Sequence, residues 1–191
     1  MNVLKINPER PQKEIIDEAS KILLAGGVIV YPTDTVYGIG SILDDAAVNR
    51  VFSAKDRMFG RPLSVAFSDI EQVINYAVVD AEQLEKIREL WCEGTTFILN
   101  KRGVPDYVTA GLPTVGVRIP DSEVCRQIIR RTGPITTTSA NLSGQNAPAE
   151  FSEIDRRILE SVDLALDGGR CRLSRPSRIL DLTSGGKILR E

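Results

Sequence analysis

The sequence predicts an α/β fold, a single domain with a twisted mixed sheet and helices on its faces. Three observations predict it. Short apolar runs that suit buried strands alternate along the chain with amphipathic segments of helical period. A length of 191 residues is enough for one domain with a sizeable core. No internal repeat, low-complexity segment or linker rich in Pro, Gly or Ser divides the chain, so one domain over residues 1–191 is expected.

The N-terminal half of the chain begins with an expected helix over residues 11–27, where Pro11 suits the first turn and Gly26-Gly27 ends the apolar periodicity. An apolar strand over 28–31 follows. Asp44 and Asp45 cap the next helix, which runs to about Ala54. The pattern then predicts strands over 62–67, 95–99 and 115–119, and helices over 81–91 and 121–131.

The C-terminal part of the chain starts at Gly133-Pro134, a turn that leads into a strand over 135–138. A helix is expected over 152–159. The last strands are expected over 162–166, 177–182 and 187–190.

Composition excludes several functional classes. Histidine is absent, which removes imidazole as a base or metal ligand. The net charge of −2 and pI of about 5.4 mean that nucleic-acid binding would need a local basic patch. Three scattered cysteines suit reduced thiols better than a disulfide framework or a zinc site. No signal peptide and no apolar run of about 20 residues is visible, so we expect a cytoplasmic protein that does not enter a membrane.

Three polar clusters follow apolar runs. The first contains Thr33 and Thr35, whose hydroxyls share one face if the segment is extended; the alternative is that they only favour β structure. The second is the basic cluster Lys55, Arg57 and Arg61, which suits a phosphate or carboxylate, unless it is a solvated helix end.

The third cluster is the run from Thr136 to Asn141, four hydroxyls and an amide at the end of a strand, which could equally be an Asx-type turn. Arg118 lies inside an apolar strand and therefore needs either a ligand or a buried carboxylate partner. The Arg-rich segment 167–177 is either a surface turn or a lid that closes on phosphates.

No P-loop and no G-x-G-x-x-G motif is present, so a nucleotide would have to bind in another way. The residues alone therefore indicate an α/β domain with a basic, hydroxyl-lined pocket for anions. Hydroxyls, an amide and cations at strand ends are how α/β proteins usually build such a pocket.

With these motifs in their order, nearly the whole chain resembles the YrdC/TsaC family, the threonylcarbamoyl-AMP synthases. The resemblance rests on the segments 31–40, 55–57, 61–63, 115–120, 139–144 and 188–190. It implies a positively charged groove and a reaction of L-threonine, bicarbonate or CO2, and ATP that gives threonylcarbamoyl-AMP and pyrophosphate. The chain departs from the family pattern at residues 91–94, at Ser177-Arg178 and at Ala66.

The resemblance also implies roles for individual residues. Lys55 and Arg57 are the expected catalytic residues, as cations that stabilise charge in the transition state. The threonine pocket is expected to contain Thr35, Arg118, Ser139 and Ser177. The residues expected to bind ATP are Lys55, Arg57, Arg61, Thr114, Asn141 and Arg190. Mg2+ is expected to arrive with ATP, with no dedicated metal site on the protein.

The expected partners are ATP, L-threonine, bicarbonate, and a downstream transferase that uses the product to make threonylcarbamoyladenosine in tRNA. Two alternatives belong to other classes. One is a module that binds double-stranded RNA or tRNA without catalysis, or at least weak RNA binding, which the acidic pI and an aromatic content of 5% disfavour. The other is a domain that handles carbamoyl-adenylate.

Overall fold

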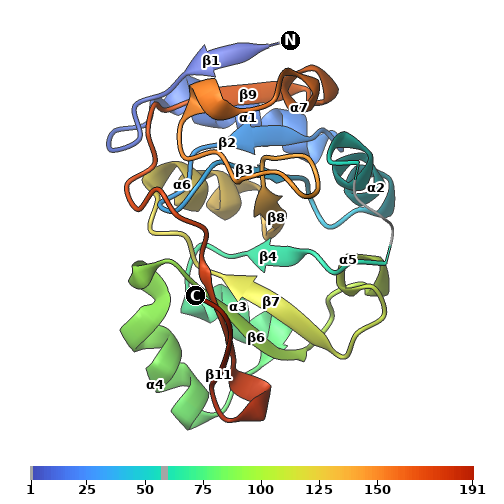
Figure 1. The fold of residues 1–191 in the computed structure, drawn as a ribbon, viewed down its shortest axis with the longest axis vertical. Coiled ribbons are helices and arrows are strands. Elements are labelled where there is room, and N and C mark those ends of the chain that lie inside the picture. The colour runs from blue at the N-terminus through green and yellow to red at the C-terminus, as the bar shows by residue number, and fades with distance from the viewer. Residues whose placement is uncertain (1, 57–59) are drawn as a thin grey trace.

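One mixed sheet runs along the long axis of the molecule (Figure 1). The computed structural model describes residues 2–56 and 60–191. Among these residues the neighbouring strands follow the order β1-β9-β2-β3-β8-β4-β7-β6-β10-β11, and β5 pairs with β6. The strands are β1 Val3–Lys5, β2 Ile29–Tyr31, β3 Gly38–Gly40, β4 Ser64–Ala66, β5 Ala77–Val78, β6 Thr95–Lys101, β7 Thr114–Arg118, β8 Ile135–Ser139, β9 Leu164–Asp167, β10 Arg178–Asp181 and β11 Lys187–Arg190.

The helices flank this sheet on both faces. They are α1 Lys13–Leu24, α2 Asp45–Ala54, α3 Ile70–Tyr76, α4 Ala81–Leu90, α5 Asp106–Thr109, α6 Glu123–Thr132 and α7 Arg156–Ser161. Short 3-10 turns occupy Trp91–Glu93, Phe151–Glu153 and Leu182–Ser184. The predicted fold class, an α/β domain with a mixed sheet, is confirmed.

Strand β2 shows why the two helical layers form. Its side chains alternate between two hydrophobic clusters: Ile29 and Tyr31 pack with α1 and α6, whereas Val30 packs with α2 and α7. All three residues are fully buried. A strand covered on both faces must be apolar throughout, which is the pattern that predicted it.

Side-chain caps fix the starts of several helices. The Asp44 carboxylate accepts from the Ala47 amide at 3.1 Å, as the sequence predicted for α2. Asp80 forms a capping box with Gln83 at the start of α4. Such caps satisfy amides that have no partner within the helix.

The prediction of one continuous helix over 152–159 is wrong. The segment is divided into the turn Phe151–Glu153 and helix α7, and Asp155 lies between them as the N-cap, accepting from the Arg157 amide at 2.9 Å. A capping residue has extended rather than helical backbone, so the helix cannot continue through Asp155. The apolar periodicity of the sequence does continue across this residue, which is why one helix was predicted. The pattern also missed the short elements β1, β3, α3, β5 and α5.

Strand β3 is the missed element that most affects the site. Its sequence is Gly-Ile-Gly, and glycine is depleted in strands, so the sequence does not predict one here. A Cβ on Gly40 would lie 1.9 Å from the Thr136 carbonyl oxygen, so only glycine lets β3 approach β8 this closely. The pairing sets Gly38 opposite Ser139.

The three cysteines differ in burial, and this predicts their reactivity. Cys92 is exposed, whereas Cys125 and Cys171 are buried. Burial raises the pKa of the Cys125 thiol to about 12 and that of the Cys171 thiol to about 11. Both buried thiols therefore stay protonated at pH 8. We expect iodoacetamide to label one cysteine in the folded protein and three in denaturant, counted by mass spectrometry. Rapid labelling of Cys125 in the folded state would contradict this.

No helix among the described residues is long and apolar enough to cross a membrane.

Candidate functional site

A cavity of about 620 Å3 opens where strands β3, β8, β4, β7, β6 and β10 meet. Its described lining contains two cations, Arg118 and Arg190, and no Asp or Glu. Hydroxyl and amide side chains supply the other polar groups: Thr33, Thr35, Tyr37, Ser64, Thr96, Thr137, Thr138, Ser139, Ser177, Asn141, Gln145 and Asn146. This inventory suits an anionic ligand with several hydroxyl groups.

The loop between β2 and β3 forms one wall. Thr33 and Thr35 lie with their Oγ1 atoms 3.0 Å apart, and the Thr35 amide donates to Thr33 Oγ1 at 3.0 Å. Thr33 Oγ1 also donates to the Val36 carbonyl at 2.7 Å. The two hydroxyls therefore line the cavity together. The sequence predicted that they share one face, but on an extended segment, whereas the structure has a closed turn.

The end of β8 forms the adjoining wall, because β3 and β8 are neighbours in the sheet. The Ala140 amide donates to the Tyr37 carbonyl at 2.8 Å and ties this loop to the threonine loop. Ser139 Oγ donates to Asn141 Oδ1, and Asn141 Nδ2 donates to the carbonyls of Leu142 and Gln145 at 2.9 and 2.8 Å. The Asn141 side chain thus closes a turn, and Asn141 also lines the cavity. The run is therefore both a turn and part of the cavity wall.

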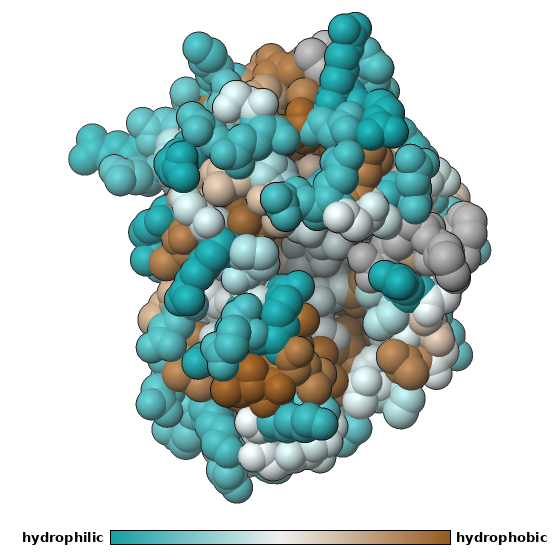
Figure 2. Space-filling view, in the orientation of Figure 1, coloured by the Kyte–Doolittle hydropathy of each residue, from teal (hydrophilic) through white to brown (hydrophobic). Residues whose placement is uncertain are grey.

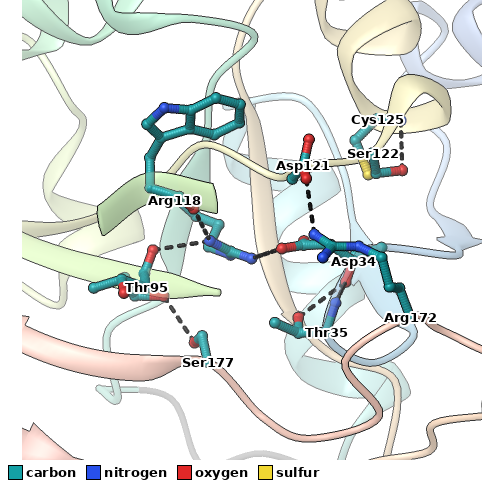
Figure 3. Close-up of polar contacts among 12 residues, drawn as sticks. Asp34, Thr35, Thr95, Arg118, Asp121, Ser122, Cys125, Arg172 and Ser177 are labelled. Atoms are coloured by element: carbon teal, nitrogen blue, oxygen red, sulfur yellow. Dashed lines mark hydrogen bonds and ion pairs between the residues drawn. The ribbon is translucent and has the colours of Figure 1, made fainter. Parts of the chain in front are cut away.

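Arg118 on β7 has a buried carboxylate partner. Its Nη2 donates to Asp34 Oδ1 and Oδ2 at 2.7 and 2.6 Å, and its Nη1 donates to the carbonyls of Thr95 and Trp91 at 2.9 and 3.3 Å. Figure 3 shows these contacts converging on the guanidinium group. Arg118 nevertheless lines the cavity. The structure therefore contains the buried ion pair that was one of the two alternatives for Arg118, and Arg118 also lines the cavity.

Lys55 lies at the C-terminal end of α2 and is 2% exposed. Its ammonium donates to the Ser139 carbonyl and, at 2.7 Å, to the Asn141 carbonyl. It is not among the residues that line the cavity, whereas both of these partners are. Its observed position is therefore behind the wall of the site, and the expected contact of Lys55 with ATP stays a prediction.

Ser177 and Arg190 meet at the opposite side of the cavity. Ser177 Oγ lies 2.8 Å from Thr96 Oγ1. Arg190 donates from Nε and Nη2 to the Ser177 carbonyl at 2.9 and 2.7 Å. Partial burial lowers the pKa of the Arg190 guanidinium, which still remains charged at neutral pH. The last strand thereby brings a cation to a cavity built mainly from the first 140 residues.

Two residues predicted to bind ATP, Arg61 and Thr114, lie outside the cavity lining. Arg61 is exposed and Thr114 is partly buried at the start of β7, and neither lines the cavity. Arg57 is outside the described residues. Their assignments stay predictions.

Sequence reasoning missed Asp34 as a member of the site. It also missed the loop that contributes Gln145, Asn146 and Ala147. The only signal for Asp34 was its place between the two predicted threonines, because its partner Arg118 is 84 residues away.

No group of three or more His, Cys, Asp or Glu side chains is arranged for a metal ion in residues 2–56 and 60–191. With no carboxylate in the cavity lining, a divalent ion there would depend on oxygens that the ligand itself supplies.

The surface near the site is mostly polar. Figure 2 shows hydrophilic residues over much of this face and an apolar area below its centre, in the region where β10 and β11 lie in Figure 1. On β11 Ile188 and Leu189 are 47% and 53% exposed.

The structure is thus an α/β domain with a hydroxyl-lined cavity that contains two arginines. Comparison with known proteins defines its family. A family model for the Sua5, YciO and YrdC proteins, described as telomere recombination, matches residues 21–191. The chain belongs to this family. A curated relative named putative threonylcarbamoyl-AMP synthase, from Methanocaldococcus jannaschii, is 36% identical over 185 residues, covering 95% of this chain and 86% of the relative.

Solved structures agree with this assignment. Sua5 of Pyrococcus abyssi, in complex with L-threonine, has a TM-score of 0.92 and 32% identity, covering 100% of this chain and 57% of that one. YciO of E. coli has a TM-score of 0.90 and 28% identity, covering 100% of this chain and 96% of that one. The chain therefore spans little more than half of the Pyrococcus protein and nearly all of YciO.

Proposed function

We propose that the protein is an enzyme, a threonylcarbamoyl-AMP synthase of the nucleotidyltransferase class. The observation that carries the proposal is the cavity, whose lining combines threonine and serine hydroxyls, an asparagine and two arginines, one of them paired with the buried Asp34. Its walls are the motifs that resemble the synthases. The names of relatives and the threonine bound in the Pyrococcus structure support the same assignment.

The proposed reaction joins three substrates. The amine of L-threonine adds to CO2, which bicarbonate supplies, and loses a proton to give a carbamate. A carbamate oxygen then attacks the α-phosphorus of ATP, the bond to the β-phosphate oxygen breaks, and pyrophosphate leaves. The protein must hold two anions side by side, and fixed cations and hydroxyl donors lower the cost of that approach.

The chain's own residues would serve this reaction through position and charge. Thr35 and Ser139 offer hydroxyls for threonine, with Arg118 and Ser177 as the other members of that pocket. Arg190 and Asn141, which line the cavity, would bind ATP, with Lys55, Arg57, Arg61 and Thr114 as further candidates. Mg2+ would enter on the phosphates of ATP. A tRNA threonylcarbamoyl transferase would consume the product, in the cytoplasm.

Pyrophosphate release tests the proposal. It should require ATP, L-threonine and bicarbonate together, and should fall to background when any one is omitted. An RNA-binding module would release none. A carbamoyl-adenylate domain would not depend on threonine. Either outcome would overturn the proposed function.

The segment from Asp167 to Ser177 is expected to act as a lid. The Leu173 amide donates to the Asp34 carbonyl at 2.7 Å, and Pro176 and Ser177 line the cavity, so ligand at the site would contact its end. Arg172 pairs with Asp121 at 2.8 Å and Arg170 with Glu150 at 3.4 Å, so these arginines are engaged away from the cavity.

Hydrogen exchange measures the lid directly. Amides of 167–177 should exchange at least ~10-fold more slowly when ATP and threonine are both saturating, because closure protects them from water. The preceding β9 residues Leu164, Ala165 and Leu166 provide the internal control, since they are fully buried. Unchanged exchange in 167–177 would show that the segment is a static surface loop.

A further inference from the structure

The ion pair between Asp34 and Arg118 is buried to an unusual degree. The Asp34 side chain is 0% exposed and the Arg118 side chain 6%. Removing two charges from water costs about as much as their attraction returns, so such a pair is weak support for stability alone. Arg118 of this pair lines the cavity, which points instead to a role in the site.

The hydrogen bonds of Arg118 show which of its donors are committed. Nη1 donates to two backbone carbonyls, those of Thr95 and Trp91, and Nη2 donates to both oxygens of Asp34. Both terminal nitrogens are therefore held by the protein. In this arrangement the guanidinium cannot also grip a ligand carboxylate with its two-pronged edge.

Asp34 also connects Arg118 to the threonine loop and the expected lid. It lies between Thr33 and Thr35, and its carbonyl accepts from the Leu173 amide at 2.7 Å. Gly94 packs against the same unit: a Cβ there would lie 2.8 Å from both Thr35 Cγ2 and Leu173 Cδ1, and 4.0 Å from Arg118 Nη2. Through its carboxylate Asp34 holds the Arg118 guanidinium, and through its backbone it is tied to Thr35 and Leu173.

We propose that Asp34 is a positioning residue for threonine and acts through Arg118. This inference rests on the proposed function. The carboxylate holds the guanidinium at one orientation and balances its charge, so that Arg118 serves as a rigid wall of the threonine pocket rather than as a free anion clamp. Arg190, whose contacts are to the carbonyl and hydroxyl of Ser177, carries a charge that no described carboxylate balances.

The variant Asp34→Asn tests this role, because it keeps the size of the side chain and removes the charge. We expect threonine affinity, measured by calorimetry, and kcat/KM for threonine each to fall at least ~10-fold, since small displacements of a positioning group have large effects. The KM for ATP should change less than ~3-fold, a split that general loss of structure would not produce.

A double-mutant cycle asks whether Asp34 acts through Arg118. Arg118→Gln should show the same threonine defect as Asp34→Asn, and adding Asp34→Asn to Arg118→Gln should cause no further loss. The double variant has no buried charge at this point and is expected to fold even if Asp34→Asn alone does not. Asp17→Asn is the matched control, because Asp17 pairs with Arg131 at 2.9 Å on the surface.

The outcomes separate the two proposals. Wild-type protein that binds threonine but releases no pyrophosphate would overturn the proposed synthase activity, while calorimetry on the variants would still test the positioning role. Wild-type threonine affinity in Asp34→Asn would overturn the positioning role. A double variant that binds threonine more weakly than Arg118→Gln would overturn it as well, because Asp34 would then act independently of Arg118.

Discussion

Replacing Lys55 by alanine is expected to lower the rate of pyrophosphate release at least ~10-fold, the scale of losing a charge-assisted contact. The structure adds a reason that the sequence did not contain. The buried ammonium donates to the carbonyls of Ser139 and Asn141, whose side chains line the cavity. Without it those carbonyls lose a donor, at a cost of about 1–3 kcal/mol for a polar group left unsatisfied. Stability and activity should therefore fall together.

Thermal denaturation and steady-state rates of the same preparations measure both effects. Lys86→Ala is the control, because Lys86 pairs with Glu82 on an exposed face of α4 and should leave both quantities near wild type. Arg57→Ala is expected to lose at least ~10-fold in rate as well, an expectation that comes from sequence alone. Folded variants at Lys55 and Arg57 with near-normal turnover would remove both residues from the proposed machinery.

Substrates without the threonine hydroxyl are expected to be rejected at least ~100-fold in kcat/KM, because a site that hydrogen-bonds a hydroxyl strongly excludes an analogue that lacks it. Alanine and 2-aminobutyrate are the test compounds. The expected donors and acceptors are Thr35, which is 5% exposed, and Ser139. Each already has a partner hydroxyl or amide beside it, which fixes its orientation before ligand arrives.

Ser139→Ala should reduce this discrimination, because the variant lacks the hydroxyl that is expected to hydrogen-bond the hydroxyl of threonine. Ser152→Ala provides the matched control at an exposed position outside the cavity lining. Equal activation of threonine and 2-aminobutyrate by the wild-type protein would show that the pocket is elsewhere. An unchanged ratio in Ser139→Ala would remove Ser139 from it.

The elements that sequence predicted well have strong local causes. Helix α2 begins at the Asp44 cap, and strand β2 is apolar because it is covered on both faces. The failures have local causes too. Residues 152–159 kept an apolar period across the Asp155 cap. Strand β3 was missed because Gly40 is required by the close approach of Thr136 and not by strand propensity.

The site likewise contains residues that local sequence patterns predicted and residues that they did not. The sequence predicted that Thr33 and Thr35 share one wall, although a turn rather than an extended segment brings them together. The order of apolar runs and polar clusters indicated Ser139 and Asn141, which lie on the adjoining wall. Contacts between distant segments were beyond any local pattern. The pairing of Asp34 with Arg118 and the return of Arg190 to the cavity both depend on the order of strands in the sheet.

In the proposed function, threonine, CO2 and ATP react together in the cavity. The most direct measurement is mass spectrometry of the product formed from L-threonine, ATP and bicarbonate labelled with carbon-13. We expect threonylcarbamoyl-AMP that carries the labelled carbon, in an amount equal to the pyrophosphate released. Pyrophosphate without labelled product, or a labelled adenylate formed equally well without threonine, would contradict it.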